Sequence, residues 1–183
     1  MLYVIRHGQV DTNVANQING WNEEVLNETG INQSKTASSQ FKNIKIDVVF
    51  CSPLLRTRQT YNNLGITGAK IIYDDRIKER NSNSMVYFDV KKLDKNLWYD
   101  KTKDIVYKDT EGFKNILKRV GSILEEIKNT YPDKNILIVT HGDICKAIYL
   151  YFNPDCKDIS QFHQGNCEII SYDLTALVPK IIS

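Results

Sequence analysis

Two of the three histidines in the sequence share the same local setting. His7 follows the largely apolar residues 2–6, His141 follows the apolar residues 136–140, and each histidine directly precedes a glycine. A short apolar run bounded by glycine is typical of a buried parallel strand, so both imidazoles are expected at the carboxyl ends of strands, where open α/β sheets bind ligands. With Arg6 beside His7, these residue types predict a cationic pocket for an anion that also holds a nucleophile.

Another predicted junction between a strand and a helix supplies further positive charge. Residues 46–51 are expected to form a strand that stops at Ser52. Serine at the N-cap and the proline after it at the first helical position predict a helix over residues 53–64, which ends at Gly65. Arg56 lies in the first turn of this helix and is expected at the same edge of the sheet as the two histidines.

The rest of the chain alternates between helical and strand patterns. Helices are expected over residues 30–43, from Asp109 or Thr110 to just before Pro132, and from His141-Gly142 to just before Pro154, and strands over 70–73, 136–140 and 167–172. In the second of these helices, apolar residues recur at i, i+3, i+4 and i+7. The alternation predicts a three-layer α/β/α sandwich around a mostly parallel central sheet. Residues 80–108 are the least regular part and are expected to form an insertion that caps the pocket.

Length and composition fit one domain over residues 1–183. Of the 183 residues, 42% are hydrophobic and 25% are charged, which is enough apolar material for a sizeable core. A formal net charge of +2 gives no reason to expect a nucleic acid or an acidic membrane surface as a partner. We find no secretion signal and no membrane span in the sequence, so a cytoplasmic protein is expected, with no oligomeric state predicted. Four cysteines without a C-x-x-C pair are expected to be reduced thiols: Cys51, Cys145, Cys156 and Cys167.

Several short motifs between residues 2 and 172 resemble those of one known family, in the same order. They are Arg6-His7-Gly8 with Asn13, Gly20-Trp21, Leu26, Gly30 and Gln33; Ser-Pro-Leu-Leu-Arg-Thr-Arg-Gln-Thr over 52–60; Ile-Lys-Glu-Arg over 77–80; Thr-His-Gly over 140–142; and Asn-Cys-Glu-Ile over 166–169. The chain thus resembles the histidine phosphatase superfamily, in its phosphoglycerate mutase-like branch. The resemblance implies that fold, a small-molecule phosphate ester as the substrate, a phosphohistidine intermediate, and no cofactor or metal.

The resemblance also implies roles for particular residues, and phosphoryl chemistry explains their types. His7 would be the nucleophile, with one neutral ring nitrogen free and the other held by a backbone carbonyl. The transferred phosphoryl group spreads charge over its oxygens, so the site needs fixed donors, which Arg6, Arg56, Asn13 and His141 would supply. The predicted helices after residues 52 and 141 are expected to aim backbone N–H groups at the same anion.

The leaving alkoxide needs a proton, and Glu79 is the candidate general acid. Such a role requires a pKa raised by burial or by anionic neighbours. Asp74, Asp75 and Glu111 are alternatives in the sequence. After Glu79 the chain departs from the family pattern over residues 80–84, which leaves the geometry of this acid loop open.

Other polar residues receive structural interpretations. Arg58 lies on a different helix face from Arg56, and we expect it in a structural salt bridge. His163 is interpreted as a surface or loop histidine. Val10 stands where the family usually has a hydroxyl residue and Thr12 where an aromatic residue is common, so one polar contact to phosphate or substrate is expected to be missing.

Three functional classes follow from these observations. A metal-independent phosphomonoesterase is favoured because the chain is short compared with mutases of the family. A phosphoglycerate mutase-type phosphotransferase and a non-catalytic module that binds phospho-ligands are the alternatives. A zinc site from His7, His141 and Cys145 is disfavoured because neighbouring arginines would repel a cation. Specificity is expected to lie in residues 80–108 and in the loop over residues 9–25.

Overall fold

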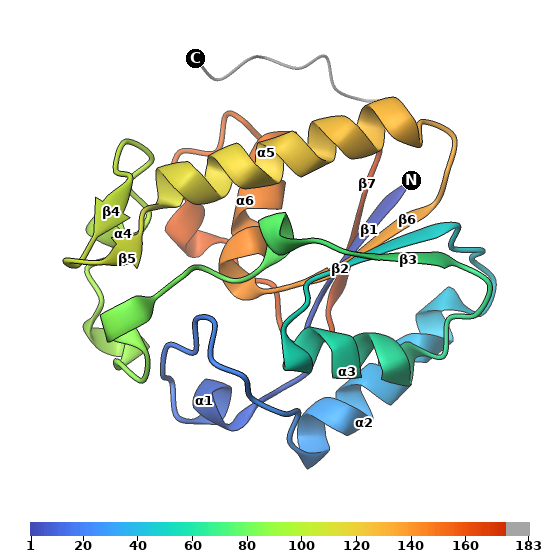
Figure 1. Cartoon of the computed structure of the whole chain (residues 1–183), viewed down its shortest axis with the longest axis horizontal. Helices are drawn as coiled ribbons and strands as arrows, with labels where there is room; N and C mark the ends of the chain where they lie inside the picture. The colour runs from blue at the N-terminus through green and yellow to red at the C-terminus, as the bar shows by residue number, and fades with distance from the viewer. Residues whose placement is uncertain (175–183) are drawn as a thin grey trace.

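A five-stranded sheet forms the centre of the fold, in the order β3-β2-β6-β1-β7. The computed structural model describes residues 1–174 (Figure 1). The strands are β1 (Leu2–Arg6), β2 (Val48–Cys51), β3 (Lys70–Tyr73), β6 (Ile136–Thr140) and β7 (Ile169–Tyr172). β7 runs antiparallel to β1, whereas the other pairs are parallel, so the predicted mostly parallel sheet is confirmed.

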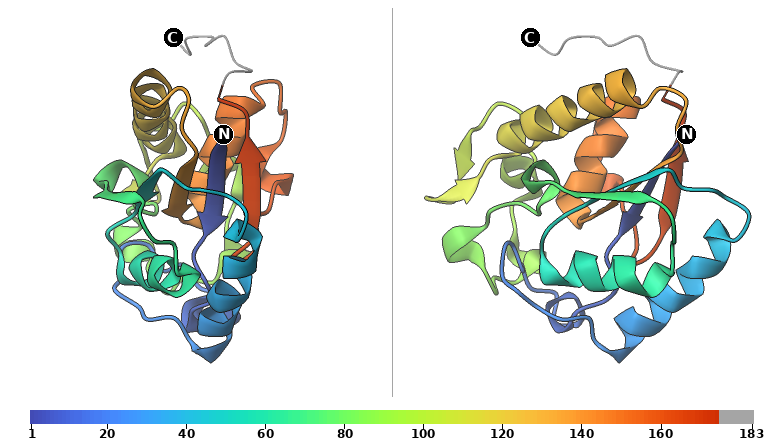
Figure 2. Two further views of the ribbon diagram at one scale, coloured as in Figure 1. Left: turned by 90° about the vertical axis from the view of Figure 1, so that its right-hand side faces the viewer. Right: turned by 45° about the vertical axis from the view of Figure 1, so that its right-hand side comes forward.

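Helices cover both faces of this sheet, as the views in Figure 2 show. The helices that do so are α2 (Glu28–Ala37), α3 (Leu55–Leu64), α5 (Phe113–Thr130) and α6 (Gly142–Phe152). The short helices α1 (Asp11–Val14) and α4 (Lys95–Trp98) lie away from the sheet. Successive side chains of a strand point to opposite faces. Val48 and Phe50 therefore join the core under α5 and α6, whereas Val49 and Cys51 join the core under α2 and α3. The predicted three-layer α/β/α sandwich is confirmed.

Two adjacent strands send the chain to opposite faces of the sheet. β1 leads through α1 to α2, which packs on the α3 side, and β6 is followed by α6, which packs on the α5 side. This divergence opens a crevice at the carboxyl ends of β1 and β6, which is the usual ligand position in open α/β sheets. Because Arg6 pairs with Thr140 in register, the next residues, His7 and His141, come out side by side.

The helix boundaries differ from the expected ones where capping differs. α3 begins at Leu55 rather than at residue 53, because Leu54 is the extended N-cap residue and Ser52 lies before it. α2 begins at Glu28 because the Asn27 side chain accepts a hydrogen bond from Gly30 N–H, and after Ala37 the chain tightens into a 3₁₀ helix (Ser38–Phe41).

The start of α5 was also predicted wrongly. Gly112 is its N-cap residue, whereas Thr110–Glu111 forms β5, which pairs with β4 (Ile105–Val106) in a separate antiparallel sheet. The predicted apolar face is confirmed: the buried side chains of α5 are Phe113, Ile116, Val120, Ile123, Leu124 and Ile127. Further 3₁₀ helices lie at Asp75–Ile77, Asn83–Met85, Val90–Lys92 and Ile159–Gln161.

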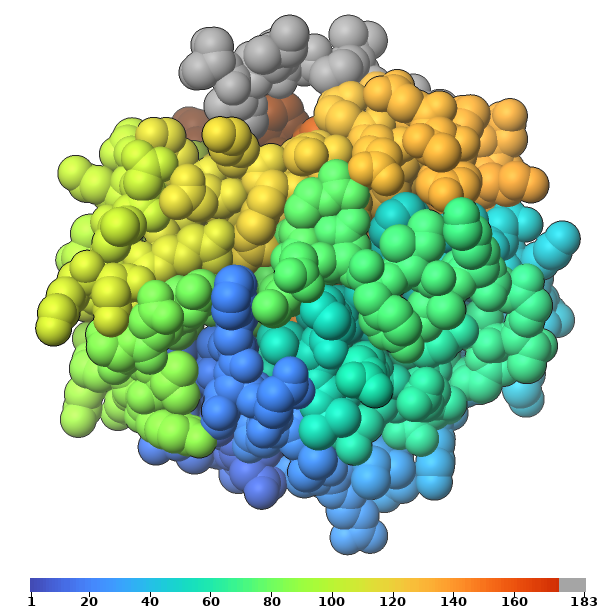
Figure 3. Space-filling model, viewed as in Figure 1, coloured from blue at the N-terminus to red at the C-terminus, as the bar shows by residue number. Residues whose placement is uncertain are grey.

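Residues 80–108 contain only short elements but pack around their own small core. Ile18 from the loop after β1 joins Met85, Trp98 and Val106 in this cluster. Two main-chain hydrogen bonds tie the segments together, from Ile18 N–H to Phe88 O (3.0 Å) and from Tyr87 N–H to Ile18 O (2.7 Å). Figure 3 shows the two segments, in blue and light green, against one another. That residues 80–108 act as a cap stays a prediction.

Two further sequence expectations concern the cysteines and membrane spans. All four cysteines are free, with Cys51, Cys145 and Cys167 buried and Cys156 half-buried. Across residues 1–174, no helix has the length and apolar character needed to cross a membrane.

Candidate active site

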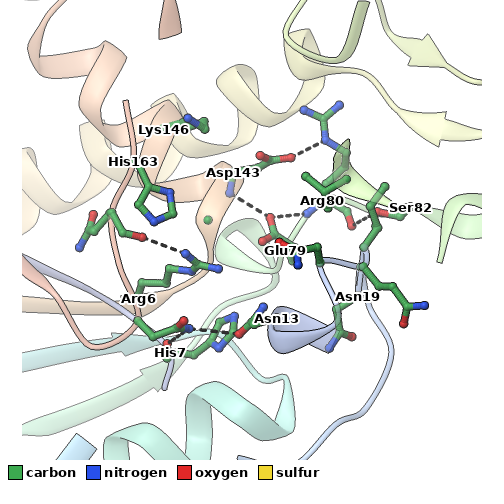
Figure 4. A pocket seen from close by; sticks show the side chains of 18 of the residues that line it. Arg6, His7, Asn13, Asn19, Glu79, Arg80, Ser82, Asp143, Lys146 and His163 are labelled. Carbon is green, nitrogen blue, oxygen red and sulfur yellow. Dashed lines mark hydrogen bonds and ion pairs between the residues drawn. The ribbon is translucent and has the colours of Figure 1, made fainter. Parts of the chain in front are cut away.

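A cavity of about 440 Å³ lies at the carboxyl ends of β1 and β6. Five residues expected in the site line it: Arg6, His7, Asn13, Arg56 and Glu79. His141, the sixth, is fully buried and does not line the cavity, but its ring centre lies 5.2 Å from that of His7. In Figure 4, Glu79 lies between His7 and Arg80, with Asp143 on the α6 side.

His7 is held in one tautomer by its own backbone. Its Nδ1 lies 2.7 Å from the carbonyl oxygen of Gly8, which can only accept a hydrogen bond, so Nδ1 carries the proton. Nε2 has no partner among residues 1–174 and keeps its lone pair. Burial, followed by the charges of Arg56 and Arg6, lowers the pKa of His7 well below the usual value. The neutral imidazole is therefore the stable form.

Gly8 is fixed in turn by the second sequence motif. Its N–H donates to Thr60 Oγ1 over 2.9 Å, and the Thr60 hydroxyl donates to Arg56 O over 2.7 Å. A side chain on Gly8 would meet Gly30 O at 2.5 Å, so only glycine permits this approach. The loop after β1, the start of α2 and the helix α3 are thus held together beneath His7.

His141 forms a pair with Ser52, whose expected role was that of an N-cap. The Ser52 Oγ lies 2.7 Å from His141 Nε2 and accepts a hydrogen bond from Leu54 N–H (3.4 Å). The hydroxyl hydrogen has no other acceptor in the described part of the chain, so it points at Nε2 and leaves the ring proton on Nδ1. Burial, then Arg56 and His7, lower the pKa of His141 well below the usual value, which disfavours the cationic form. Nδ1 is buried and has no hydrogen-bond partner, so its N–H group is available as a donor.

Arg56 comes from the first turn of α3 and is almost fully buried. Its Nη1 donates to Asn22 O (3.0 Å) and Asn19 Oδ1 (3.4 Å), and its Nη2 donates to Gly20 O (2.8 Å). A guanidinium has five N–H groups, so Nε–H and one Nη2–H remain. Burial lowers the pKa of Arg56 to about 10, which still leaves it charged at neutral pH.

Arg6 and Asn13 are oriented by the loop before β7. Arg6 Nη1 donates to Gln164 O over 2.9 Å, which leaves four of the N–H groups unused. Asn13 Oδ1 accepts from Val10 N–H (3.2 Å) and from Asn166 Nδ2 (3.2 Å), so its own Nδ2 donors are directed elsewhere. Both side chains thus offer donors at the cavity wall.

At the starts of α3 and α6, three of the amides expected to donate to an anion already have protein acceptors, whereas Gly142 N–H at the cavity wall has none within residues 1–174. Leu55 N–H at the start of α3 donates to Glu23 Oε2 (2.8 Å), and Asp143 N–H at the start of α6 donates to Glu79 Oε1 (3.3 Å). Leu54 N–H is taken by Ser52. These three amides are therefore not available to an anion, and donation from the start of α6 through Gly142 N–H stays a prediction.

One carboxyl oxygen of Glu79 faces the cavity, and the other is hydrogen-bonded to the backbone. Oε1 accepts hydrogen bonds from Arg80 N–H (2.9 Å) and Asp143 N–H (3.3 Å). Oε2 has no partner within residues 1–174 and lies 3.8 Å from where a side chain on Gly142 would begin. Burial, then the charge of Asp143, raise the pKa of Glu79, against the Arg80 N–H bond, Arg56 and Arg6. A protonated carboxyl with its free oxygen at the cavity suits proton donation.

Arg119 of α5 fixes the backbone that carries Glu79. Its guanidinium donates to the carbonyls of Arg76 and Lys78 (both 2.7 Å) and of Glu79 (3.1 Å). Glu111 holds Arg119 in place through an ion pair of 2.8 Å. This clamp keeps the acid loop in position despite its departure from the family pattern.

The alternative acids do not reach the cavity. Glu111 is committed to Arg119, Asp74 pairs with Arg76 at 2.6 Å, and Asp75 is exposed. None of the three is a lining residue. Glu79 is therefore the only candidate of the four that faces the space beside His7.

The charge of the cavity matches a phosphate ester. Four cationic side chains and two carboxylates line it: Arg6, Arg56, Arg80 and Lys146, with Glu79 and Asp143. Two net positive charges remain to balance a phosphate dianion when Glu79 is ionised, and three when it is protonated. An imidazole nucleophile, guanidinium donors and a carboxylic acid in one cavity can bind a phosphoryl group, attack it and protonate a leaving oxygen.

Several residues differ from their sequence interpretation. Arg58 is exposed and makes no ion pair with the described residues, so the expected salt bridge is wrong. His163 is exposed as expected but stands on the rim of the cavity. Thr12 is buried and donates to Glu24 (2.6 Å), and Val10 is fully buried, so neither offers a polar group to the cavity.

Arg80, Asp143 and Gln164 were missed by the sequence interpretation because their roles depend on contacts between distant segments. Of these three, only Asp143 could have been identified from the sequence, because it is an acid in the first turn of a helix that follows a site histidine. The set of His7, His141 and Cys145 forms no metal site: within residues 1–174 no three His, Cys, Asp or Glu side chains are arranged to hold an ion.

Comparisons with known proteins bear on the family and the fold of the chain. The family model of the histidine phosphatase superfamily (branch 1) matches residues 2–181. The chain is 26% identical over 182 residues to phosphoserine phosphatase 1 of Hydrogenobacter thermophilus, which covers 94% of this chain and 84% of that protein. It is 24% identical over 200 residues to a 2,3-bisphosphoglycerate-dependent phosphoglycerate mutase of Allorhizobium ampelinum, covering 98% and 88%.

A solved structure shows the same fold. The phosphoserine phosphatase of Entamoeba histolytica in complex with 3-phosphoglyceric acid has a TM-score of 0.78 and 23% identity, covering 92% of this chain and 87% of that chain. Both phosphatases and mutases are thus among the relatives, and both kinds of enzyme transfer phosphoryl groups. The chain therefore belongs to branch 1 of the histidine phosphatase superfamily.

Proposed function

We propose that the protein is a metal-independent phosphatase that hydrolyses small-molecule phosphate monoesters through a phosphohistidine at His7. The observation that carries this proposal is the tautomer of His7: the Gly8 carbonyl holds Nδ1–H at 2.7 Å, so Nε2 is the nucleophilic nitrogen. The same carbonyl stabilises the positive charge that develops on the ring when Nε2 forms a bond to phosphorus. The reduced thiols fit a cytoplasmic location.

In the first half-reaction, the Nε2 lone pair attacks phosphorus while the bond from phosphorus to the ester oxygen breaks. Glu79 gives its proton from Oε2 to that oxygen, so an alcohol leaves rather than an alkoxide. The remaining N–H groups of Arg6 and Arg56 and the Asn13 amide bind the equatorial oxygens, whose charge is largest in the transition state. Nδ1–H of His141, buried behind the cavity wall without a partner, is the further donor to the same oxygens once the phosphoryl group is seated against His7.

In the second half-reaction, the Glu79 carboxylate takes a proton from water. The water oxygen bonds to phosphorus as the bond from phosphorus to nitrogen breaks, which releases phosphate, neutral His7 and protonated Glu79. No divalent ion is required because guanidinium groups neutralise the phosphoryl oxygens.

A partition experiment tests this function. The protein is incubated with a panel of labelled phosphate monoesters, in the presence and absence of a hydroxyl acceptor such as glycerate, and free phosphate and transferred phosphate are both measured. Hydrolysis should predominate with every acceptor. Transfer to the acceptor at a rate above hydrolysis would assign a mutase instead, and binding without turnover of any ester would assign a non-catalytic module.

A further inference from the structure

A buried ion pair lies directly behind the candidate acid. Arg80 Nε and Asp143 Oδ2 are 2.7 Å apart, and the side chains are 1% and 13% exposed. Asp143 also accepts hydrogen bonds from Trp98 Nε1 (3.1 Å) and from the Tyr99 hydroxyl (3.2 Å). The Arg80 guanidinium stacks on the Trp98 ring at 4.0 Å. The Asp143 carboxylate is therefore held in one orientation by three donors.

Both members of this pair also bind Glu79, through their main chains. Arg80 N–H and Asp143 N–H donate to the same oxygen, Oε1, at 2.9 and 3.3 Å. Two N–H donors fix Oε1 as the carbonyl-type oxygen of the acid, so the proton belongs on Oε2 at the cavity. Figure 4 shows the two hydrogen bonds to Glu79 and the ion pair behind it. The pair thus acts on the rotamer of Glu79 as well as on the charge around it.

We propose that Asp143 is a positioning residue that keeps Glu79 protonated and oriented for donation, and that Arg80 limits its effect by opposing its charge. This inference rests on the proposed function, in which Glu79 is the proton donor. Neither residue touches the transferred phosphoryl group in this proposal; both act through Glu79.

The other groups around Glu79 make such a counter-charge necessary. Arg6 at the end of β1 and Arg56 of α3 lower the pKa of Glu79. The proposed function needs both arginines to bind the phosphoryl group. His7 and His141 are neutral and add no charge.

The other charged and polar groups packed around Glu79 contribute little to the charge that it experiences. Arg119 of α5 is neutralised by Glu111 of β5. Burial raises the pKa of the Tyr99 hydroxyl far above neutrality, so it stays uncharged, as does the buried Cys145 thiol of α6, whose pKa is also raised. Lys78 points away and lies over the Trp21 ring at 3.8 Å. Lys146 of α6 also lines the cavity and donates to the carbonyls of Ile159 and Phe162. Asp143 is the carboxylate whose charge acts on Glu79 against the two arginines.

The proposal predicts opposite effects for the two members of the pair. In Asp143→Asn the negative charge is lost while the backbone N–H remains, so Glu79 should lose its proton at lower pH. In a plot of kcat/KM against pH for an alkyl phosphate, the basic limb reports the pKa of the essential acid. In this variant the basic limb should move to lower pH. In Arg80→Gln the carboxylate is unopposed, and the same limb should move to higher pH. A purely structural role would move both limbs in the same direction or neither.

Matched controls separate charge from folding. Asp74→Asn removes a carboxylate of equal exposure (13%) from another arginine pair, outside the cavity, and should leave the limb in place. Asp143→Glu keeps the charge and should keep the limb near its original position. Near-ultraviolet circular dichroism checks the fold of each variant. If Asp143→Asn does not fold, the upward shift in Arg80→Gln and the retained limb in Asp143→Glu decide the question.

The two possible failures are distinguishable. If Glu79→Gln retains the basic limb, Glu79 is not the donor and the proposed function is wrong in that step. If the limb depends on Glu79 but stays in place in both Asp143→Asn and Arg80→Gln, only the role of Asp143 is overturned.

Discussion

Nδ1 of His7 donates to the carbonyl oxygen of Gly8, the next residue, over 2.7 Å. In the proposed reaction Nε2 is therefore the reactive nitrogen, because a carbonyl cannot donate and Nε2 is left with its lone pair. The phosphoryl group should therefore be found on Nε2 of His7.

Trapping the intermediate tests this assignment. Phosphohistidine survives base and is lost in acid, so a brief incubation with labelled ester followed by an alkaline quench should place the label on His7. His7→Ala should abolish labelling, whereas His163→Ala, a change on the rim, should keep it. Label on His141, or an acid-stable label, would contradict the assignment.

Glu79→Gln should slow different esters to different extents. An alkyl leaving group needs a proton, so the rate with alkyl phosphates should fall by the ~10²–10⁴ typical of lost acid–base catalysis. Aryl esters such as p-nitrophenyl phosphate should lose much less, since their leaving oxygen is stable as an anion. Arg56→Ala should depress both classes alike, because it removes charge from the common phosphoryl group. Equal losses in the Glu79 variant would point to another donor.

Removal of metals should leave activity intact. Chelators should change the rate by less than about twofold, because guanidinium groups perform the neutralisation that metal ions perform elsewhere. Orthovanadate and free phosphate should inhibit competitively by occupying the same donors. Loss of activity in chelator that zinc or magnesium restores would count against the proposed reaction.

Two of the three histidines should resist protonation in the folded protein. His7 and His141 have lowered pKa values, chiefly through burial and then through Arg56. The unfolded chain binds protons at these rings with the usual pKa of about 6.5. The contribution of the two neutral rings to the free energy of unfolding should therefore be complete above that pH and should be lost as the pH drops below it. NMR titration of labelled histidine rings reads this directly. Arg56→Gln should raise the pKa of both rings; unchanged titration would exclude the charge effect.

Two glycine substitutions should have opposite effects on stability. In Gly30→Ala the new side chain would begin at a position only 2.1 Å from the backbone oxygen of Gln9, so the loop under Gly8 must shift. We expect a loss of about 1–3 kcal/mol in the free energy of unfolding, measured in urea. Gly121→Ala, in α5 with open space around it, should gain about 0.5–1 kcal/mol. A stable Gly30→Ala variant would contradict the close approach.

The sequence by itself determined the elements whose pattern is local and repetitive. The apolar face of α5 follows helical spacing, the strands that precede His7 and His141 are continuous apolar runs, and Gly65 ends α3 in the left-handed conformation. Because parallel strands bring their carboxyl ends to one edge, the grouping of His7, Arg6, Arg56 and Glu79 also followed from sequence order and motif resemblance.

The tertiary structure alone decided how those side chains are partnered. Ser52 reads as an N-cap in sequence, yet its hydroxyl belongs to His141, 89 positions away. Arg80 and Asp143, 63 positions apart, meet only because the acid loop crosses the end of β6, where Thr140 Oγ1 binds Ile77 O at 2.8 Å. Protonation states depend on such burial and charge, which come from segments distant in sequence, so no local pattern encodes them.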